Sequence, residues 1–128
     1  MTNIYLTLSI LDGAFAICRL DASEPLPEWA LASDFFSITR ARDEISIVCK
    51  QDNVPEGIRY ERDWRCFRVE GPLDFSLTGI LNSLTSPLAS AGVSIFAIST
   101  FDTDYLLVKE RDFERAVENL VAAGHIVA

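Results

Sequence analysis

Between Trp64 and Val127, the apolar residues change their spacing in an order that constrains the fold more than any other feature of the chain. Runs in which every second residue is apolar have the period of β-strands, whereas steps of three and four residues have the period of amphipathic helices. The spacing predicts strands at residues 64–70, 93–100, 105–109 and 125–127 and helices at residues 77–91 and 112–123. This βαββαβ order predicts an α+β fold: a four-stranded antiparallel sheet with both helices on one face, the ferredoxin-like arrangement.

Glycine and proline punctuate the two predicted helices. Gly92 and Gly124 follow the last apolar position of each helix, where glycine commonly ends a helix. Pro87 lies inside the first helical stripe, where it removes one backbone hydrogen bond. We therefore expect a kink or a break near residues 83–86.

The beginning of the chain predicts a β-hairpin. Residues 4–11 and 14–20 both have strand character, and the dipeptide Asp12-Gly13 separates them. Asp-Gly between two strand-like runs is a strong hairpin signal, because both residues tolerate the positive φ angles of a tight turn. We expect these two strands to pair with each other.

The rest of the first half contains further strands and little helix. Residues 35–39 and 45–50 predict a second hairpin with a charged tip, and Pro27 can open a short helix through Leu31. Residues 51–63 mix proline, glycine and charges, so we expect a connection there, with a short edge strand possible at residues 58–60.

Length and charge limit the domain count and the partners. The 128 residues suit one domain or two very small ones, and we expect a strand-rich half at residues 1–62 and a second unit at residues 63–128. The net charge of -8 opposes binding to nucleic acid and to anionic membranes. The start of the chain does not resemble a signal peptide and no 18-residue apolar run occurs, so we expect a cytoplasmic protein.

The cysteines and the single histidine do not suggest catalysis. Cys18, Cys49 and Cys66 are widely spaced within strand-like runs, which favours buried thiols over disulfides. His125 has no metal-ligand neighbours in sequence and is expected at the surface or at a strand end. Because no catalytic or metal-binding motif is present, we expect neither an enzyme nor a bound cofactor.

Two aspartates between the predicted strands, Asp102 and Asp104, allow three interpretations. They can stabilise the turn by accepting backbone hydrogen bonds, which is their commonest role. They can hold a cationic ligand, such as lysine, arginine or an amino acid's ammonium group, through two-point hydrogen bonds. An acid–base pair in a small enzyme, together with Glu110 or Asp112, is the third interpretation.

The turn at residues 71–79 joins the first predicted strand to the first helix, whose initial N–H groups lack partners within the helix. Asp74 or Ser76 can cap that helix, and for Asp74 contact with a ligand remains equally open. Gly79 would weaken the first helical turn, so we expect something to pack closely against its backbone.

Three stretches of the second half resemble ACT domains, in particular the CASTOR-type members and the regulatory domains of aspartate kinases. The stretches are Leu77-Thr78-Gly79-Ile80-Leu81, Ala91-Gly92-Val93-Ser94-Ile95 and Ser99-Thr100-Phe101-Asp102-Thr103-Asp104-Tyr105. The resemblance covers roughly the second half of the chain, so the first half would be a reduced ACT-like unit.

The resemblance implies a small free-standing regulatory protein that binds an amino acid or a similar small molecule at an interface between ACT units. A homodimer is the expected assembly, and a ligand-independent protein-interaction module is the alternative function. The residues that the resemblance assigns to the ligand are Asp74, Phe75, Thr78, Gly79, Ile95, Phe96, Ala97, Ser99, Thr100, Asp102 and Asp104.

Overall fold

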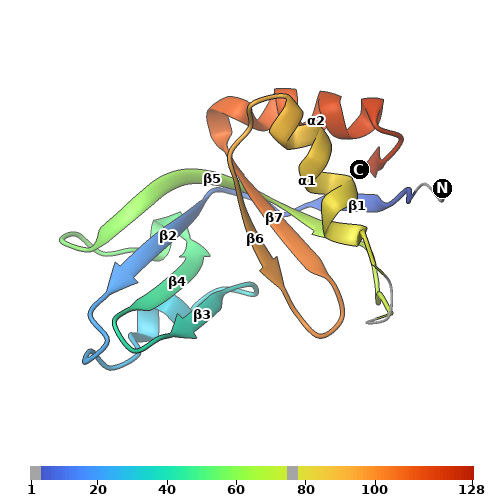
Figure 1. The fold of residues 1–128 in the computed structure, drawn as a ribbon. Helices are drawn as coiled ribbons and strands as arrows, with labels where there is room; N and C mark the ends of the chain where they lie inside the picture. Colours follow the sequence, from blue (N-terminus) through green and yellow to red (C-terminus); the bar gives the residue numbers. More distant parts are fainter. Residues whose placement is uncertain (1–3, 75–77) are drawn as a thin grey trace. The chain divides into compact units, whose positions relative to one another are not determined.

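The computed structural model describes residues 4–74 and 78–128, which divide into two compact units (Figure 1). Unit 1 consists of the described residues up to Asp12 together with those from Arg65 onward, and unit 2 consists of residues 13–64. The strand at the start of the chain therefore belongs with the second half of the sequence, whereas we had expected it within a unit at residues 1–62. No helix in the described residues is long and apolar enough to cross a membrane.

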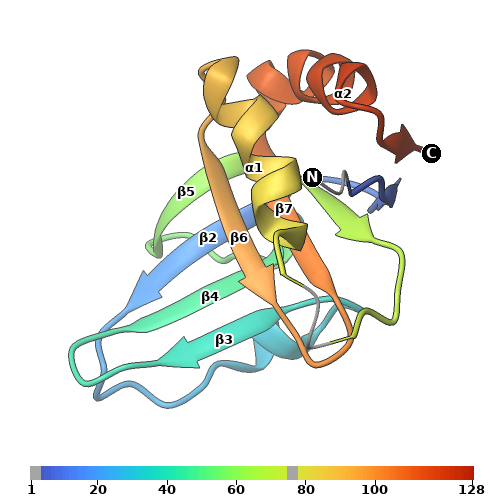
Figure 2. The ribbon, with the colours of Figure 1, turned by 45° about the vertical axis from the view of Figure 1, so that its right-hand side comes forward.

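Unit 1 is an open sheet covered on one face by two helices (Figures 1 and 2). Its strands lie in the order β6-β7-β5-β1-β8. Their bounds are β1 Thr7–Ile10, β5 Arg59–Val69, β6 Ile95–Ser99, β7 Asp104–Lys109 and β8 Ile126–Val127, and the helices are α1 Ile80–Ser90 and α2 Phe113–Ala122. A short 3-10 helix, η3, spans Glu110–Asp112 before α2. The α+β ferredoxin-like fold is thereby confirmed.

The sheet of unit 1 differs from the expected four-stranded one because β1 is inserted between β5 and β8. β1 pairs antiparallel with β5 and parallel with β8, with Thr7 opposite Ile126. The alternation in β1 directs Leu8, which is fully buried, into the same core cluster as Phe67 and Leu120. Burial of this apolar face favours the central position of β1 over an edge position.

Both helices end as the glycines predict. At the end of α1, Gly92 has φ +74°, and the N–H of Val93 donates to the carbonyl of Leu88 at 3.0 Å. The same arrangement ends α2 at Gly124, whose φ is +101°. These bonds satisfy carbonyl groups that a helix end leaves without partners. The expected break near residues 83–86 is absent, since α1 continues through Pro87 as one helix.

Unit 2 is a small antiparallel sheet with the order β3-β4-β2-β5, in which β5 takes part through its first residues. Its other strands are β2 Phe15–Leu20, β3 Ser37–Arg40 and β4 Ile45–Lys50, and its 3-10 helices are η1 Glu28–Leu31 and η2 Gln51–Asn53. The β3–β4 hairpin and the short helix after Pro27 confirm the sequence prediction. A second core cluster forms here around Ala16, Ile45 and Ile47.

The predicted hairpin at Asp12-Gly13 is wrong. β1 pairs with the last part of β5, where Ile10 lies opposite Phe67, and β2 pairs with its first part, where Phe15 lies opposite Trp64. The positive φ of Gly13, +81°, therefore interrupts two strands that share a partner and does not reverse the chain. The Asp-Gly dipeptide indicates a positive φ, but whether that angle forms a hairpin turn or a break between two strands depends on which strand pairs with them.

The expected connection at residues 51–63 is wrong in part: the short strand allowed at residues 58–60 is the start of β5, which begins at Arg59 and continues to Val69. A bulge interrupts its pairing with β2 at Asp63, whose φ is +66°. The side chain of Gln51 holds this residue: its Oε1 accepts from the Asp63 N–H at 2.6 Å, and its Nε2 donates to the Asp63 carboxylate at 3.0 Å. The charged residues that suggested a loop lie on an exposed strand.

The three cysteines are free and buried, as expected. In unit 2, a hydrogen bond to Cys49 and burial both raise the pKa of the Cys18 thiol. A raised pKa keeps a thiol protonated and unreactive. The same hydrogen bond lowers the pKa of Cys49, and it is burial that places all three side chains in the packed interior.

Candidate functional site

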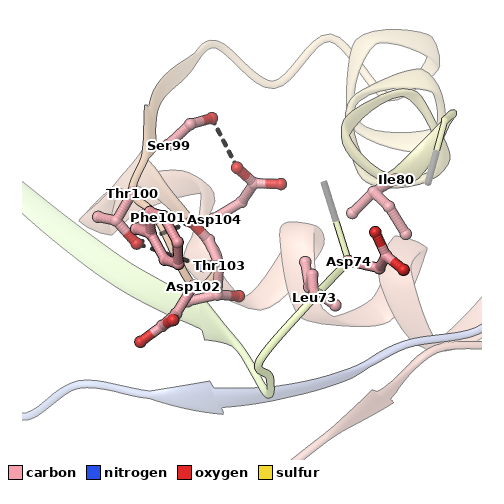
Figure 3. Close-up of a pocket in the computed structure, with 9 residues that line it drawn as sticks. All are labelled: Leu73, Asp74, Ile80, Ser99, Thr100, Phe101, Asp102, Thr103 and Asp104. Atoms are coloured by element: carbon pink, nitrogen blue, oxygen red, sulfur yellow. Dashed lines mark hydrogen bonds between the residues drawn. The ribbon is translucent and has the colours of Figure 1, made fainter. Parts of the chain in front are cut away.

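A cavity of about 190 Å³ opens in unit 1 where the segment after β5, the start of α1 and the β6–β7 loop meet (Figure 3). The residues that line it are Leu73, Asp74, Ile80, Ser99, Thr100, Phe101, Asp102, Thr103 and Asp104. Five of the residues that the ACT resemblance assigns to a ligand thus lie around one opening.

The β6–β7 loop is held by several hydrogen bonds. Strand pairing ends where Ser99 lies opposite Asp104, and the N–H of Thr100 donates to the carbonyl of Thr103 at 2.8 Å. The buried hydroxyl of Thr103 donates to the carbonyl of Val69 at 2.6 Å. Because both ends of the loop are fixed, its side chains are presented from a rigid frame.

The segment after β5 packs directly on this loop. The N–H of Leu73 donates to the carbonyl of Asp102 at 2.7 Å. A Cβ on Gly71 would lie 3.1 Å from that carbonyl oxygen and 3.3 Å from the Cβ of Thr103. An alanine at position 71 would therefore require these neighbours to shift by a few tenths of an ångström.

The lining of the cavity is acidic. It contains three aspartates and no lysine, arginine or histidine. The carboxylate of Asp104 accepts from the Ser99 hydroxyl at 2.6 Å, and Figure 3 shows it directed toward the side of the cavity that carries Ile80 and Asp74. The side chain of Asp102 points away from that side. Of the two aspartates of the loop, Asp104 is therefore the one directed into the cavity.

The nearest basic group stands outside the lining. The guanidinium of Arg68 donates to the Tyr105 hydroxyl at 3.3 Å, and this bond raises the pKa of Arg68, with smaller contributions from Glu70 and Asp102. Arg68 also pairs with Glu70 at 3.3 Å. The positive charge of Arg68 is thus paired with Glu70, so it does not offset the negative charge of the aspartates that line the cavity.

Helix α1 begins later than the sequence suggests, and this changes the roles of two residues. Gly79 is the N-cap, with φ +79°, so its positive φ explains the glycine and Asp74 does not cap the helix. Close packing explains the glycine less well, because a Cβ at position 79 would lie 3.4 Å from Cδ1 of Ile4. Among the described residues, no side chain caps the first N–H groups of α1, and these groups can donate to a polar partner. The other capping candidate, Ser76, lies outside the described residues.

The remaining predicted site residues lie elsewhere. Thr78 and Gly79 line a separate hollow of unit 1 beside His125. Ile95, Phe96 and Ala97 lie on β6 and do not line the cavity at the β6–β7 loop. Phe75 falls outside the described residues.

Four residues of the lining were missed: Leu73, Ile80, Phe101 and Thr103. Phe101 is 79% exposed at the tip of the loop. Its place between two polar residues in a short connection was a usable sign of exposure. Nothing in the local sequence indicates that Ile80 faces the loop, because that contact joins distant parts of the chain.

His125 lies directly before β8, as one of its two expected places at the surface or at a strand end requires, but it is not at the surface. His125 is buried, its Nδ1 accepts from the N–H of Leu6 at 3.0 Å, and its Nε2 lies 2.9 Å from the carbonyl of Ser83. Since the Leu6 N–H can only donate, the hydrogen must sit on Nε2 and point at Ser83. The usual helical donor to that carbonyl would be residue 87, and Pro87 has no N–H. His125 therefore replaces the hydrogen bond that the proline removes.

Two charged residues that had been candidates for catalysis take part in ion pairs. Glu110 lies 3.4 Å from Arg65, and Asp112 lies 2.9 Å from Arg115. These contacts fit the solvated face of η3 and α2. In the described part of the chain, no group of three or more histidine, cysteine or acidic residues could hold a metal ion.

A family model described as an ACT domain matches residues 59–121, from the first residue of β5 to the last turn of α2. This region of the chain is an ACT domain. A second model, described as an N-terminal domain, matches residues 13–57, which lie within unit 2.

A named relative matches less than half of this chain. The cytosolic arginine sensor for mTORC1 subunit 1 of Homo sapiens is 41% identical over 58 residues, which cover 44% of this chain and 18% of the sensor. The match thus spans a small part of that relative's length. The resemblance to CASTOR-type ACT domains is confirmed at this level.

Solved structures support the whole fold. An X-ray structure of a protein from Agobacterium tumefaciens is 46% identical and has a TM-score of 0.93, over 98% of this chain and 93% of that chain. The ligand-free regulatory subunit of aspartate kinase from Thermus thermophilus has a TM-score of 0.65 at 14% identity, over 91% of this chain and 96% of that chain. The second likeness shows a shared fold.

Proposed function

We propose that this ACT-domain protein is a cytoplasmic regulator that binds an amino acid, or a similar small molecule, through the cavity beside the β6–β7 loop. The observation that carries the proposal is the acidic lining: the described residues around the cavity include three aspartates and no lysine, arginine or histidine. Such a site favours a ligand with an ammonium or guanidinium group.

The start of α1 supplies the complementary partner. Ile80, the first residue of the helix, lines the cavity, and the N–H groups of the first turn have no partners within the helix. Helix N-termini attract carboxylates through these groups and through the helix dipole. An amino acid would place its carboxylate there and its cationic group between Asp74 and Asp104.

The size of the cavity suggests that a second copy completes the site. Its volume of about 190 Å³ is below the roughly 300–1,000 Å³ usual for small-molecule pockets. We propose a homodimer in which another ACT unit covers the opening. Thr78 and Ile95, which the resemblance assigns to the ligand but which do not line the cavity, would lie closer to that second unit. The regulated target would be another protein.

Arginine is the first ligand to test, because one relative is named as an arginine sensor and a guanidinium matches a carboxylate with two parallel hydrogen bonds. The experiment is a thermal-shift series with the twenty amino acids. A bound ligand at about 100 times its dissociation constant should stabilise the protein by about 2.7 kcal/mol. Asp104→Asn should abolish most of that shift because it removes the charge and largely keeps the shape of the side chain.

Glu118→Gln is the matched control, because Glu118 is exposed on α2 and does not line the cavity. The substitution removes the same charge as Asp104→Asn. It should leave the shift unchanged. Light scattering with and without the ligand measures whether binding requires or strengthens the dimer. If no amino acid produces a shift, the proposal is wrong and the protein is better explained as a ligand-independent interaction module.

A further inference from the structure

Unit 2 has a larger cavity of its own, about 540 Å³, which is within the range of small-molecule sites. It forms between the end of β2, the loop that follows β2, the 3-10 helix η1 and the start of β5. One wall is apolar and includes Trp29, Ile58 and Pro27. This cavity is separate from the acidic one, and nothing in the proposed ACT-domain function uses it.

The walls of this cavity are anchored. Trp29 and Ile58 pack against the core cluster of unit 2. From β3, Arg40 donates to two carbonyl groups of the loop after β2, at 2.6 Å to Ala22 and 3.2 Å to Glu24. These bonds fix the loop against the sheet, so the cavity is preformed.

Two arginines meet in the lining. Arg19 of β2 and Arg59 of β5 are direct partners in the strand register, and both line the cavity. Like charges directly opposite each other across two strands are destabilising. An anion bound to either guanidinium would reduce this repulsion.

The two arginines differ in what already holds them. The Arg19 guanidinium donates to the carbonyl of Asp43 at 2.9 Å and lies 3.5 Å from the carboxylate of Asp21. Within the part of the chain that the structure describes, the Arg59 guanidinium has no hydrogen bond or ion pair. Arg19 is thus positioned by the protein, whereas Arg59 is free to bind.

We infer that this cavity binds a small monocarboxylate with an apolar or aromatic body. The carboxylate would accept two parallel hydrogen bonds from Arg59, for which the planar guanidinium is well suited. The apolar body would lie against Trp29 and Ile58. Two acidic residues, Asp21 and Glu24, also line the cavity and oppose a highly charged anion such as a phosphate.

The test is titration of the full-length protein, labelled with ¹⁵N, with phenylacetate while the backbone amide signals are recorded. Saturable shifts are expected at residues 19–29 and 57–59. Benzyl alcohol, which has the aromatic body without the carboxylate, and acetate, which has the carboxylate without the body, should each bind at least about tenfold more weakly.

Arg59→Gln should weaken phenylacetate binding by about tenfold or more, because a charge-assisted hydrogen bond is lost. Arg62→Gln, on the same strand but outside the lining, is the matched control and should bind like the unaltered protein. Trp29→Phe tests the apolar wall and should weaken phenylacetate more than acetate. The inference is overturned if phenylacetate causes no saturable shift in these residues, if Arg59→Gln binds normally, or if benzyl alcohol binds as well as phenylacetate.

Discussion

The two units of this protein are assembled in opposite ways. Unit 2 is a continuous stretch of chain, whereas unit 1 combines a strand from the beginning of the sequence with elements from the second half. The hydrogen bond from Leu6 to His125 spans 119 positions, and β1 lies between β5 and β8. Unit 1 should therefore depend on long-range contacts that unit 2 does not need, and three changes can test this difference.

The largest effect is expected from Leu8→Ala. Leu8 is fully buried among side chains of β5 and α2, so its truncation should cost about 2–5 kcal/mol of unfolding free energy. Urea unfolding measures the loss, and amide hydrogen exchange locates it. Protection should fall more in unit 1 than in unit 2.

Leu31→Ala is the control in unit 2, where Leu31 is 48% exposed in η1. It should change the unfolding free energy by about 1 kcal/mol or less. Equal losses from the two leucine variants would mean that β1 is not an integral strand of unit 1. The contrast between a discontinuous and a continuous unit would then fail.

Elements set by local signals were predictable from the sequence. Helix α1, its closing glycine and the β3–β4 hairpin follow from apolar spacing and turn residues. The use of Asp12-Gly13 was not predictable, because a positive φ serves a hairpin and a strand interruption equally well. Only the pairing of β1 and β2 with the distant strand β5 decides between them.

The same division applies to the candidate site. Asp102 and Asp104 could be found because they lie in a short connection between two apolar strands. Their approach to Asp74 required the resemblance to ACT domains, since the hydrogen bond from Leu73 to Asp102 joins segments about thirty residues apart. The cavity of unit 2 gave no local signal, because Arg19 and Arg59 become neighbours only through the register of β2 and β5.

A smaller effect is expected from His125→Ala, which tests the link between the start of the chain and α1. The change leaves the N–H of Leu6 and the carbonyl of Ser83 without their partner. An unsatisfied buried backbone group costs about 1–3 kcal/mol. Urea unfolding should show a loss in this range.

Pro87→Ala provides an internal check on that explanation. It restores an N–H that can donate to the Ser83 carbonyl within α1. The loss caused by His125→Ala should therefore be smaller in the Pro87→Ala background, and a double-mutant cycle measures the coupling. Equal losses in both backgrounds would show that His125 does not compensate for the proline.

The smallest effect is expected in a comparison of two glycines with similar backbones and different surroundings. An alanine at either Gly92 or Gly124 must adopt a positive φ, at a cost of about 1–2 kcal/mol. At Gly92 a Cβ would meet nothing within 4 Å among the described residues, whereas at Gly124 it would collide with the ring of Tyr5. Because Tyr5 is 63% exposed and can turn away, the excess cost of Gly124→Ala should be only about 1 kcal/mol.

Adding Tyr5→Ala should remove this excess in thermal unfolding. If it persists, the strain at Gly124 does not come from the N-terminal segment.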